Sequence, residues 1–147
     1  MIALIQRVKN SFVIRQATGE EIARIGKGLL VFLGVKKGDS ETNAVALAKK
    51  IPSLRIFEDQ QGKMNLSLFE VKGEILVVSQ FTLYADTKKG NRPSFSEAAE
   101  KEKAFALYEK FLHHLRYQGV PTKSGIFGES MLVVIENDGP VTLILEE

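Results

Sequence analysis

The stretch Asn137-Asp138-Gly139-Pro140-Val141-Thr142 lies between two short apolar runs, at residues 131–135 and 141–145. Both runs have the length and the Val, Ile and Leu content of β-strands, and the Asn, Asp, Gly and Pro between them favour a tight reversal. The stretch therefore predicts a hairpin near the end of the sequence. About 5–6% of X-Pro bonds in folded proteins are cis, so the turn by itself favours a trans Gly139-Pro140 bond.

The composition narrows the chemistry that is open to this chain. Its 147 residues include no cysteine and two adjacent histidines, His113 and His114. Disulfides, thiolate metal sites and a cysteine nucleophile are excluded, and a His-rich metal centre or a Ser-His-Asp triad has little to draw on. We expect no metal and no cofactor. The net charge of +2 permits a polyanionic partner without requiring one.

The start of the chain has no targeting pattern. Residues 1–9 form a strand-length run with charges at its end, which is not the basic-then-apolar order of a signal peptide. No apolar run approaches the roughly 20 residues of a membrane span. We expect a cytoplasmic protein without a membrane segment, and a length of 147 residues fits one domain, residues 1–147.

The remaining patterns predict an α+β domain with a mostly antiparallel, barrel-like sheet and two main helices. Residues 41–51 form an amphipathic helix capped by Asp39 or Ser40 and ended by Pro52. The second helix runs from Ser96 or Glu97 to about Gln118, with the histidines near its end in a structural or surface role. Strands are predicted at 2–8, 11–16, 21–35 with Gly28 inside it, 54–57, 66–69 and 74–84.

Two polar segments stand out against this scaffold. Ser79-Gln80 interrupts the apolar run 74–84, and buried polar groups cost free energy unless they find partners. The pair is therefore either hydrogen-bonded locally or faces a cleft. The basic loop 86–94 is either a solvated loop or a functional loop on a rigid scaffold.

Three motifs together resemble the D-aminoacyl-tRNA deacylase family, of the D-tyrosyl-tRNA deacylase type. They are Ser79-Gln80-Phe81-Thr82-Leu83, Lys89-Gly90-Asn91-Arg92-Pro93-Ser94-Phe95 and the stretch 137–142. The similarity continues through residues 5–8, 26–30 and 63–67, so it covers essentially the whole chain. Each motif alone is weak, and their shared order and spacing make the resemblance specific.

The resemblance implies hydrolysis of the ester between a D-amino acid and the terminal ribose of tRNA, by a homodimer that uses no metal. Gly139-Pro140 would be the family's Gly-cisPro element, which one subunit inserts into the partner subunit's active site. Its carbonyl oxygens would accept hydrogen bonds from the substrate's α-amino group and leave no room for an L side chain. Glycyl-tRNA, including glycine mischarged on alanine tRNA, has no side chain to reject and should also be cleaved.

The resemblance also implies which residues form the site. Ser79, Gln80, Phe81 and Thr82 would line the scissile ester as the catalytic segment, and Phe127 and Met131 would flank the pocket with Ala104 in its wall. Basic residues near the pocket are candidates for contact with the tRNA backbone, or else solvated surface: Lys88, Lys89, Arg92 and Lys123.

The mechanism has two alternatives at this point. An aminoacyl ester is activated and its ribose carries a neighbouring hydroxyl, so an enzyme needs mainly to orient the ester and stabilise an oxyanion, for which backbone N–H groups around Phe81 are candidates. No base lies near Thr82 in the sequence. We therefore favour substrate-assisted hydrolysis through the ribose hydroxyl over direct attack by Thr82.

Two other classes of function compete with this interpretation. A non-catalytic nucleic-acid-binding module is one, because some eukaryotic relatives are linked to DNA at replication origins, although this sequence ends Leu145-Glu146-Glu147 with no basic tail. A general esterase is the other, although no G-x-S-x-G motif is present.

Overall fold

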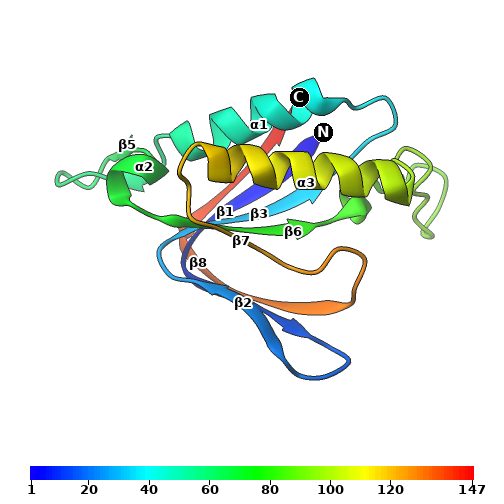
Figure 1. The fold of residues 1–147 in the computed structure, drawn as a ribbon, viewed down its shortest axis with the longest axis horizontal. Coiled ribbons are helices and arrows are strands. Elements are labelled where there is room, and N and C mark those ends of the chain that lie inside the picture. The colour runs from blue at the N-terminus through cyan, green and yellow to red at the C-terminus, as the bar shows by residue number, and fades with distance from the viewer.

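A curved sheet covered on one face by two helices forms the body of the molecule (Figure 1). The computed structural model describes residues 1–147. Helices α1 (Glu41–Ser53) and α3 (Lys101–Tyr117) lie side by side on the same face, and α2 (Leu68–Val71) is a single turn. The strands are β1 (Ile2–Arg15), β2 (Glu21–Ile25), β3 (Gly28–Gly34), β4 (Phe57–Glu58), β5 (Met64–Leu66), β6 (Glu74–Ser79), β7 (Thr122–Ser124) and β8 (Met131–Glu146).

Strand β1 organises the six-stranded sheet because it pairs along both of its edges. Its first half pairs with β3 and its second half with β2, while β8 pairs antiparallel with it from end to end. Strands β3, β6 and β7 are parallel to one another, so the sheet is mixed and not purely antiparallel. The predicted α+β, barrel-like fold with two main helices is confirmed, with this addition.

The predicted C-terminal hairpin is wrong. Both apolar runs belong to the single strand β8, which pairs with β1 from Met131 opposite Arg15 to Glu146 opposite Ile2. Between the pairs Val8–Asn137 and Gln6–Thr142, β8 uses more residues than β1, and the surplus forms a bulge. Gly139 and Pro140 lie in this bulge, and Gly139 adopts a φ of 122° that suits glycine.

Other predicted boundaries also shift. The strands predicted at 2–8 and 11–16 are one strand, β1, and the strand predicted at 74–84 ends at Ser79 and gives way to a 3₁₀ turn, η1 (Phe81–Tyr84). Residues 66–69 were predicted as extended, but Ser67 and Glu70 form a capping box that starts α2. The strand predicted at 54–57 is displaced to β4. Helix α1 follows its predicted cap at Ser40, whereas α3 begins later than predicted, at Lys101.

Two apolar clusters occupy the two faces of the sheet. The larger one joins the helices to the sheet and includes Ala3, Ile5, Val31, Leu47 and Phe111. The smaller one lies on the opposite face, where the sheet curls away from the helices, and consists of Val8, Val13, Ile25, Leu30, Leu76 and Val78. The face opposite the helices therefore has a buried centre but no helix to cover its outer rows.

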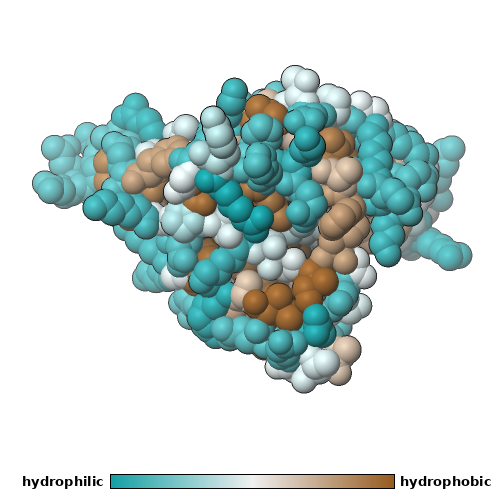
Figure 2. All heavy atoms as spheres, viewed as in Figure 1, coloured by the Kyte–Doolittle hydropathy of each residue, from teal (hydrophilic) through white to brown (hydrophobic).

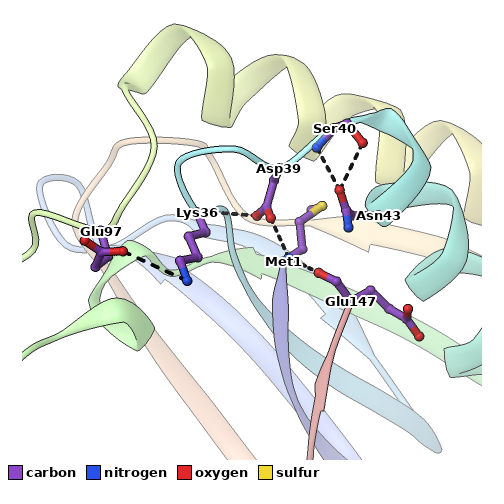
Figure 3. A network of polar contacts seen from close by, with 7 residues as sticks. All are labelled: Met1, Lys36, Asp39, Ser40, Asn43, Glu97 and Glu147. Carbon is purple, nitrogen blue, oxygen red and sulfur yellow. Dashed lines mark hydrogen bonds and ion pairs between the residues drawn. The ribbon is translucent and has the colours of Figure 1, made fainter.

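The two ends of the chain meet beside the loop that precedes α1 (Figure 3). The α-amino group of Met1 lies 2.9 Å from Asp39 Oδ1 and also donates to the Glu147 carbonyl. Asp39 Oδ2 accepts the Lys36 N–H at 2.6 Å, so one carboxylate ties the β1 start to the loop. The same loop holds residues 97–99, because Lys37 N–H donates to Glu97 O and Ala99 N–H donates to Val35 O, each at 2.9 Å.

Replacing Asp39 by Ala is expected to lower the free energy of unfolding by about 1–3 kcal/mol, because two donors, one of them a charged amine, lose a shared acceptor. Denaturation midpoints in urea measure the effect. Glu97→Gln is the control, since its pair with Lys36 spans 4.0 Å between exposed side chains, and such pairs contribute under about 1 kcal/mol. Equal losses in the two variants would contradict a special role for Asp39.

Candidate active site

A cavity of about 730 Å³ opens between the end of β6, the start of α3 and the start of β8. This size lies within the roughly 300–1,000 Å³ usual for ligand sites. Figure 2 shows apolar side chains gathered below α3, beside the connection from β7 to β8. The cavity lining is mostly apolar and draws on segments that are far apart in the sequence.

The polar pair Ser79-Gln80 faces this cavity. Ser79 ends β6 opposite Leu33, and the Gln80 N–H donates to the Leu33 carbonyl at 2.8 Å, so the chain is fixed where it leaves the sheet. Residues Phe81–Tyr84 then form η1, and the first N–H groups of a helical turn have no partner within it. Ser79, Gln80 and Phe81 line the cavity, and Gln80 Nε2 also donates a local hydrogen bond to Thr82, so both alternatives hold for the pair.

Thr82 is placed differently from its three neighbours. It is exposed, and it is not among the residues that line the cavity. Its Oγ1 accepts a hydrogen bond from Gln80 Nε2. The partner of this hydroxyl is a side-chain amide, which does not act as a base. A catalytic role for Thr82 stays a prediction.

Phe127, Met131 and Ala104 also line the cavity, and their role in substrate binding stays a prediction. The Phe127 ring is fixed by Phe105 and Tyr108, whose ring centroids lie 5.2 and 5.7 Å away. Tyr108 donates its hydroxyl to the Val77 carbonyl at 3.0 Å, and burial raises the pKa of Tyr108, so the group stays a neutral donor. The Met131 thioether accepts the Ile126 N–H at 3.3 Å. The wall is thus anchored on the same strand that carries Ser79.

Part of the lining was missed by the sequence interpretation. The lining also includes Phe95, Ala98, Ala99, Glu100, Lys101, Gly128, Glu129 and Ser130. The sequence prediction placed residues 96–100 in the second helix, so their contribution to the cavity was not expected. Phe95 was already part of one of the three motifs. Glu129 is held by Arg15, with 2.8 Å between its Oε2 and Arg15 Nε.

Gly139 and Pro140 do not line the cavity of their own chain. Both are exposed, and the peptide bond between them is cis. Arg7 supports the bulge, and its side chain is only 4% exposed. Its Nε donates a hydrogen bond to the Asp138 carbonyl at 3.1 Å. Arg7 Nη1 also donates to the Ile56 carbonyl at 2.7 Å. Arg7, which sequence reasoning did not select, therefore fixes the bulge to the body of the sheet.

The basic candidates separate into two places. Lys88, Lys89 and Arg92 lie in an exposed loop closed by pairing of Asp86 with Ser94, next to the cavity residue Phe95. Lys123 lies elsewhere, with its Nζ 2.6 Å from the Arg24 carbonyl and 3.6 Å from Glu74. The loop cations are thus better placed for a ligand of the cavity than Lys123 is.

A family model described as D-Tyr-tRNA(Tyr) deacylase matches residues 4–146. The chain belongs to this family. D-aminoacyl-tRNA deacylases of Persephonella marina and Aquifex aeolicus are each 54% identical to it over 146 residues, which are 99% of this chain and 97% of the relative. A similar deacylase of Geobacter sulfurreducens is 51% identical over 146 residues, 99% of this chain and 95% of the relative.

Solved structures give the same fold for this deacylase-family chain. One, titled "c-Myc DNA Unwinding Element Binding Protein", has a TM-score of 0.93 and 43% identity, and covers 100% of this chain and 99% of that one. Another, a probable eukaryotic D-amino acid tRNA deacylase, is similar in fold, with a TM-score of 0.79 and 22% identity over 99% and 98% of the two chains.

Two further observations concern this member of the deacylase family. No helix is long and apolar enough to cross a membrane. No group of three or more His, Cys, Asp or Glu side chains is placed to hold a metal ion. The histidines lie outside the cavity lining, with His114 Nε2 3.8 Å from Glu41.

Proposed function

We propose that this chain is a hydrolase that cleaves the ester bond of D-aminoacyl-tRNA and releases the free D-amino acid and tRNA. The observation that carries the proposal is the cavity, where Ser79, Gln80 and Phe81 meet Phe127 and Met131 from a distant part of the chain. The family match over residues 4–146 and the 54% identical deacylases support the same activity. We expect the enzyme to act in the cytoplasm, where aminoacyl-tRNA is made and used.

The chemistry we propose relies on the substrate's own ribose. With the ester at the β6 end, N–H groups at the start of η1 would stabilise the oxyanion that forms when water adds to the carbonyl carbon. The neighbouring ribose hydroxyl would relay a proton from the attacking water to the ester oxygen of the ribose. The ester C–O bond would then break, leaving the water's oxygen on the carbonyl carbon and the ribose oxygen protonated. Support comes from Thr82, whose hydroxyl is outside the cavity lining and bonded to an amide.

We further propose a homodimer that forms on the sheet face opposite the helices. Ile144, Leu4, Phe32 and Val78 are paired in succession across β8, β1, β3 and β6, so they form one apolar row on that face. The row runs from Ile144, which is 64% exposed, to Val78, which lines the cavity. A second copy lying on this row would cover apolar surface and bring its own bulge toward the cavity.

The bulge would then select the D enantiomer in the partner subunit's cavity. Gly139 and Pro140 are exposed and lie outside their own cavity, as an element that acts in the partner must. The carbonyl oxygens of Gly139 and Pro140 would accept hydrogen bonds from the substrate's α-amino group and leave no space for an L side chain. Glycine has no side chain, so glycyl-tRNA, including glycine mischarged on alanine tRNA, would be cleaved as well.

Single-turnover release of labelled amino acid from matched D- and L-tyrosyl-tRNA tests the activity and its enantiomer preference. The expected result is release from the D substrate at least about 100-fold faster than from the L substrate, with glycyl-tRNA cleaved at a measurable rate. The same rates are expected with a chelator present. Equal rates for the two enantiomers would contradict selection by the bulge, and no release from either would contradict the deacylase activity.

Gly125→Ala is expected to weaken substrate binding by crowding the cavity wall. A Cβ at Gly125 would lie 2.9 Å from Met131 Cε and Sδ, so the flexible end of Met131 has to move. We expect KM to rise by about threefold to tenfold, and the free energy of unfolding to fall by at most about 1–3 kcal/mol, the range usual for overpacking. Gly26→Ala is the matched control, because its nearest neighbour atom would be 3.9 Å away. A KM equal to that of the control would show that Met131 does not shape the binding surface.

The loop cations Lys88, Lys89 and Arg92 are proposed to meet the tRNA backbone. They are exposed beside the cavity, where a phosphodiester chain leaving the site would pass. Binding should therefore weaken with salt. Lys123 is a weaker candidate, because its amine already contacts Arg24 and Glu74.

A nucleic-acid-binding module without catalysis is the second candidate function. It is favoured by one observation, the 43% identical structure whose title names a DNA unwinding element binding protein. Retention of bare duplex DNA at physiological salt, together with no release of D-amino acid from tRNA, would favour this function over hydrolysis.

A further inference from the structure

Two aromatic rings, Phe81 and Phe95, form an exposed pair in the cavity lining. Their centroids are 5.1 Å apart and their planes cross at 73°, so the edge of one ring meets the face of the other. Phe81 is 54% exposed and Phe95 is 36% exposed, although both line the cavity. Apolar rings held in this way at a site keep ring surface that a planar ligand can cover.

The position of the pair relates it to the path of a nucleic acid. Phe95 directly follows Ser94, whose pairing with Asp86 closes the basic loop that carries Lys88, Lys89 and Arg92. Phe81 begins η1, directly after Gln80 at the end of β6. The pair therefore bridges the reactive end of the cavity and the root of the basic loop. A strand that leads from the cavity to the loop has to pass these two rings.

We propose that Phe95 stacks on the base of the nucleotide that precedes the terminal adenosine of the substrate. The proposal rests on the proposed function, since it assumes that the esterified nucleoside occupies the cavity. The 3′ end of tRNA is single-stranded, so its bases have free faces, and proteins bind such bases by aromatic stacking beside basic groups that track the backbone. Stacking accepts any base, so this subsite adds affinity for a polynucleotide without reading its sequence.

The alternative use of Phe95, as a wall for the amino-acid side chain, predicts a different dependence on substrate length. A ring that contacts the amino acid or the terminal adenosine acts equally on a nucleoside ester and on longer esters. A ring that holds the preceding base acts on esters that contain that base. Substrate length therefore separates the two roles.

The test compares Phe95→Leu with wild type on D-tyrosyl-adenosine, on the D-tyrosyl ester of cytidylyl-adenosine and on D-tyrosyl-tRNA. We expect the variant's KM to rise about tenfold more for the dinucleotide and tRNA esters than for the nucleoside ester, the order expected for loss of one stacked base. The single-turnover rate at saturation should change little. Phe95→Tyr should keep the wild-type KM for all three esters, because it keeps the ring.

Phe69→Leu serves as the matched control, because Phe69 is also an exposed ring, at 44%, but lies on α2 away from this cavity. It should leave all three KM values at the wild-type level. A Phe95→Leu loss of the same size on the nucleoside and dinucleotide esters, or no loss on any ester, would overturn the subsite. Absence of D-tyrosine release by wild type would instead overturn the proposed function, and the subsite with it.

Discussion

Replacing Arg7 by Gln is expected to reduce deacylation of D-aminoacyl-tRNA at least about 100-fold, because the bulge that carries Gly139 and Pro140 loses its support. Arg7 donates to the Asp138 carbonyl, and a Cβ placed on Gly139 would lie 2.9 Å from Arg7 Nη2, so guanidinium and bulge are in close contact. A carbonyl pair that has to meet an α-amino group within hydrogen-bond reach tolerates little displacement. Single-turnover rates at saturating enzyme measure the loss.

Mixed dimers distinguish a misplaced bulge from an unfolded chain. Ala104→Phe fills the cavity wall and should inactivate the cavity of its own chain while leaving its bulge intact. When the Arg7→Gln and Ala104→Phe chains are mixed in equal amounts and allowed to exchange, about a quarter of all sites should combine an intact cavity with an intact bulge from the partner. Activity restored to that order supports action in the partner subunit. Two inactive variants that remain inactive after mixing would contradict it.

Local signals were sufficient where the structure depends on neighbours in sequence. Ser40 caps α1, and the helix buries Ala44, Leu47, Ala48 and Ile51 at helical spacing, as the pattern predicted. The sequence also marked the polar pair at the end of β6 as unusual, because polar groups in an apolar strand need partners or a cleft, and the pair has both a local hydrogen bond and a place in the cavity lining.

The errors concern residues whose partners are distant in sequence. The stretch 137–142 has the composition of a turn, and a bulge uses the same residues, so only pairing with β1, more than a hundred residues away, decides between them. Arg7 lies in a strand and its neighbours in sequence give no sign that it is buried. The carbonyls that accept its hydrogen bonds, those of Ile56 and Asp138, belong to distant parts of the chain. The cavity residues 98–101 were likewise missed, because the bond from the Ala99 N–H to the Val35 carbonyl that places them joins segments far apart in the sequence.

Replacing Ile144 by Asp is expected to yield a monomer with at least about 100-fold less deacylase activity. In the single chain Ile144 is 64% exposed, so a carboxylate there meets water and should leave the fold intact. In the proposed dimer the same carboxylate would enter an apolar row beside Leu4, and burying an unpaired charge costs several kcal/mol. Without the partner subunit each cavity lacks the bulge that orients the α-amino group. Sedimentation velocity and single-turnover rates, measured on the same preparation, give both quantities.

Tyr117→Asp is the matched control, because Tyr117 is 83% exposed at the end of α3, on the helix-covered face of the sheet. It introduces the same charge into another exposed apolar position, and should leave both the dimer and the rate unchanged. A dimeric Ile144→Asp variant would move the interface away from this row, since an unpaired carboxylate buried at an apolar interface is strongly destabilising. A monomeric variant with full activity would show that the cavity works without the partner's Gly139 and Pro140, and the bulge would then need another role.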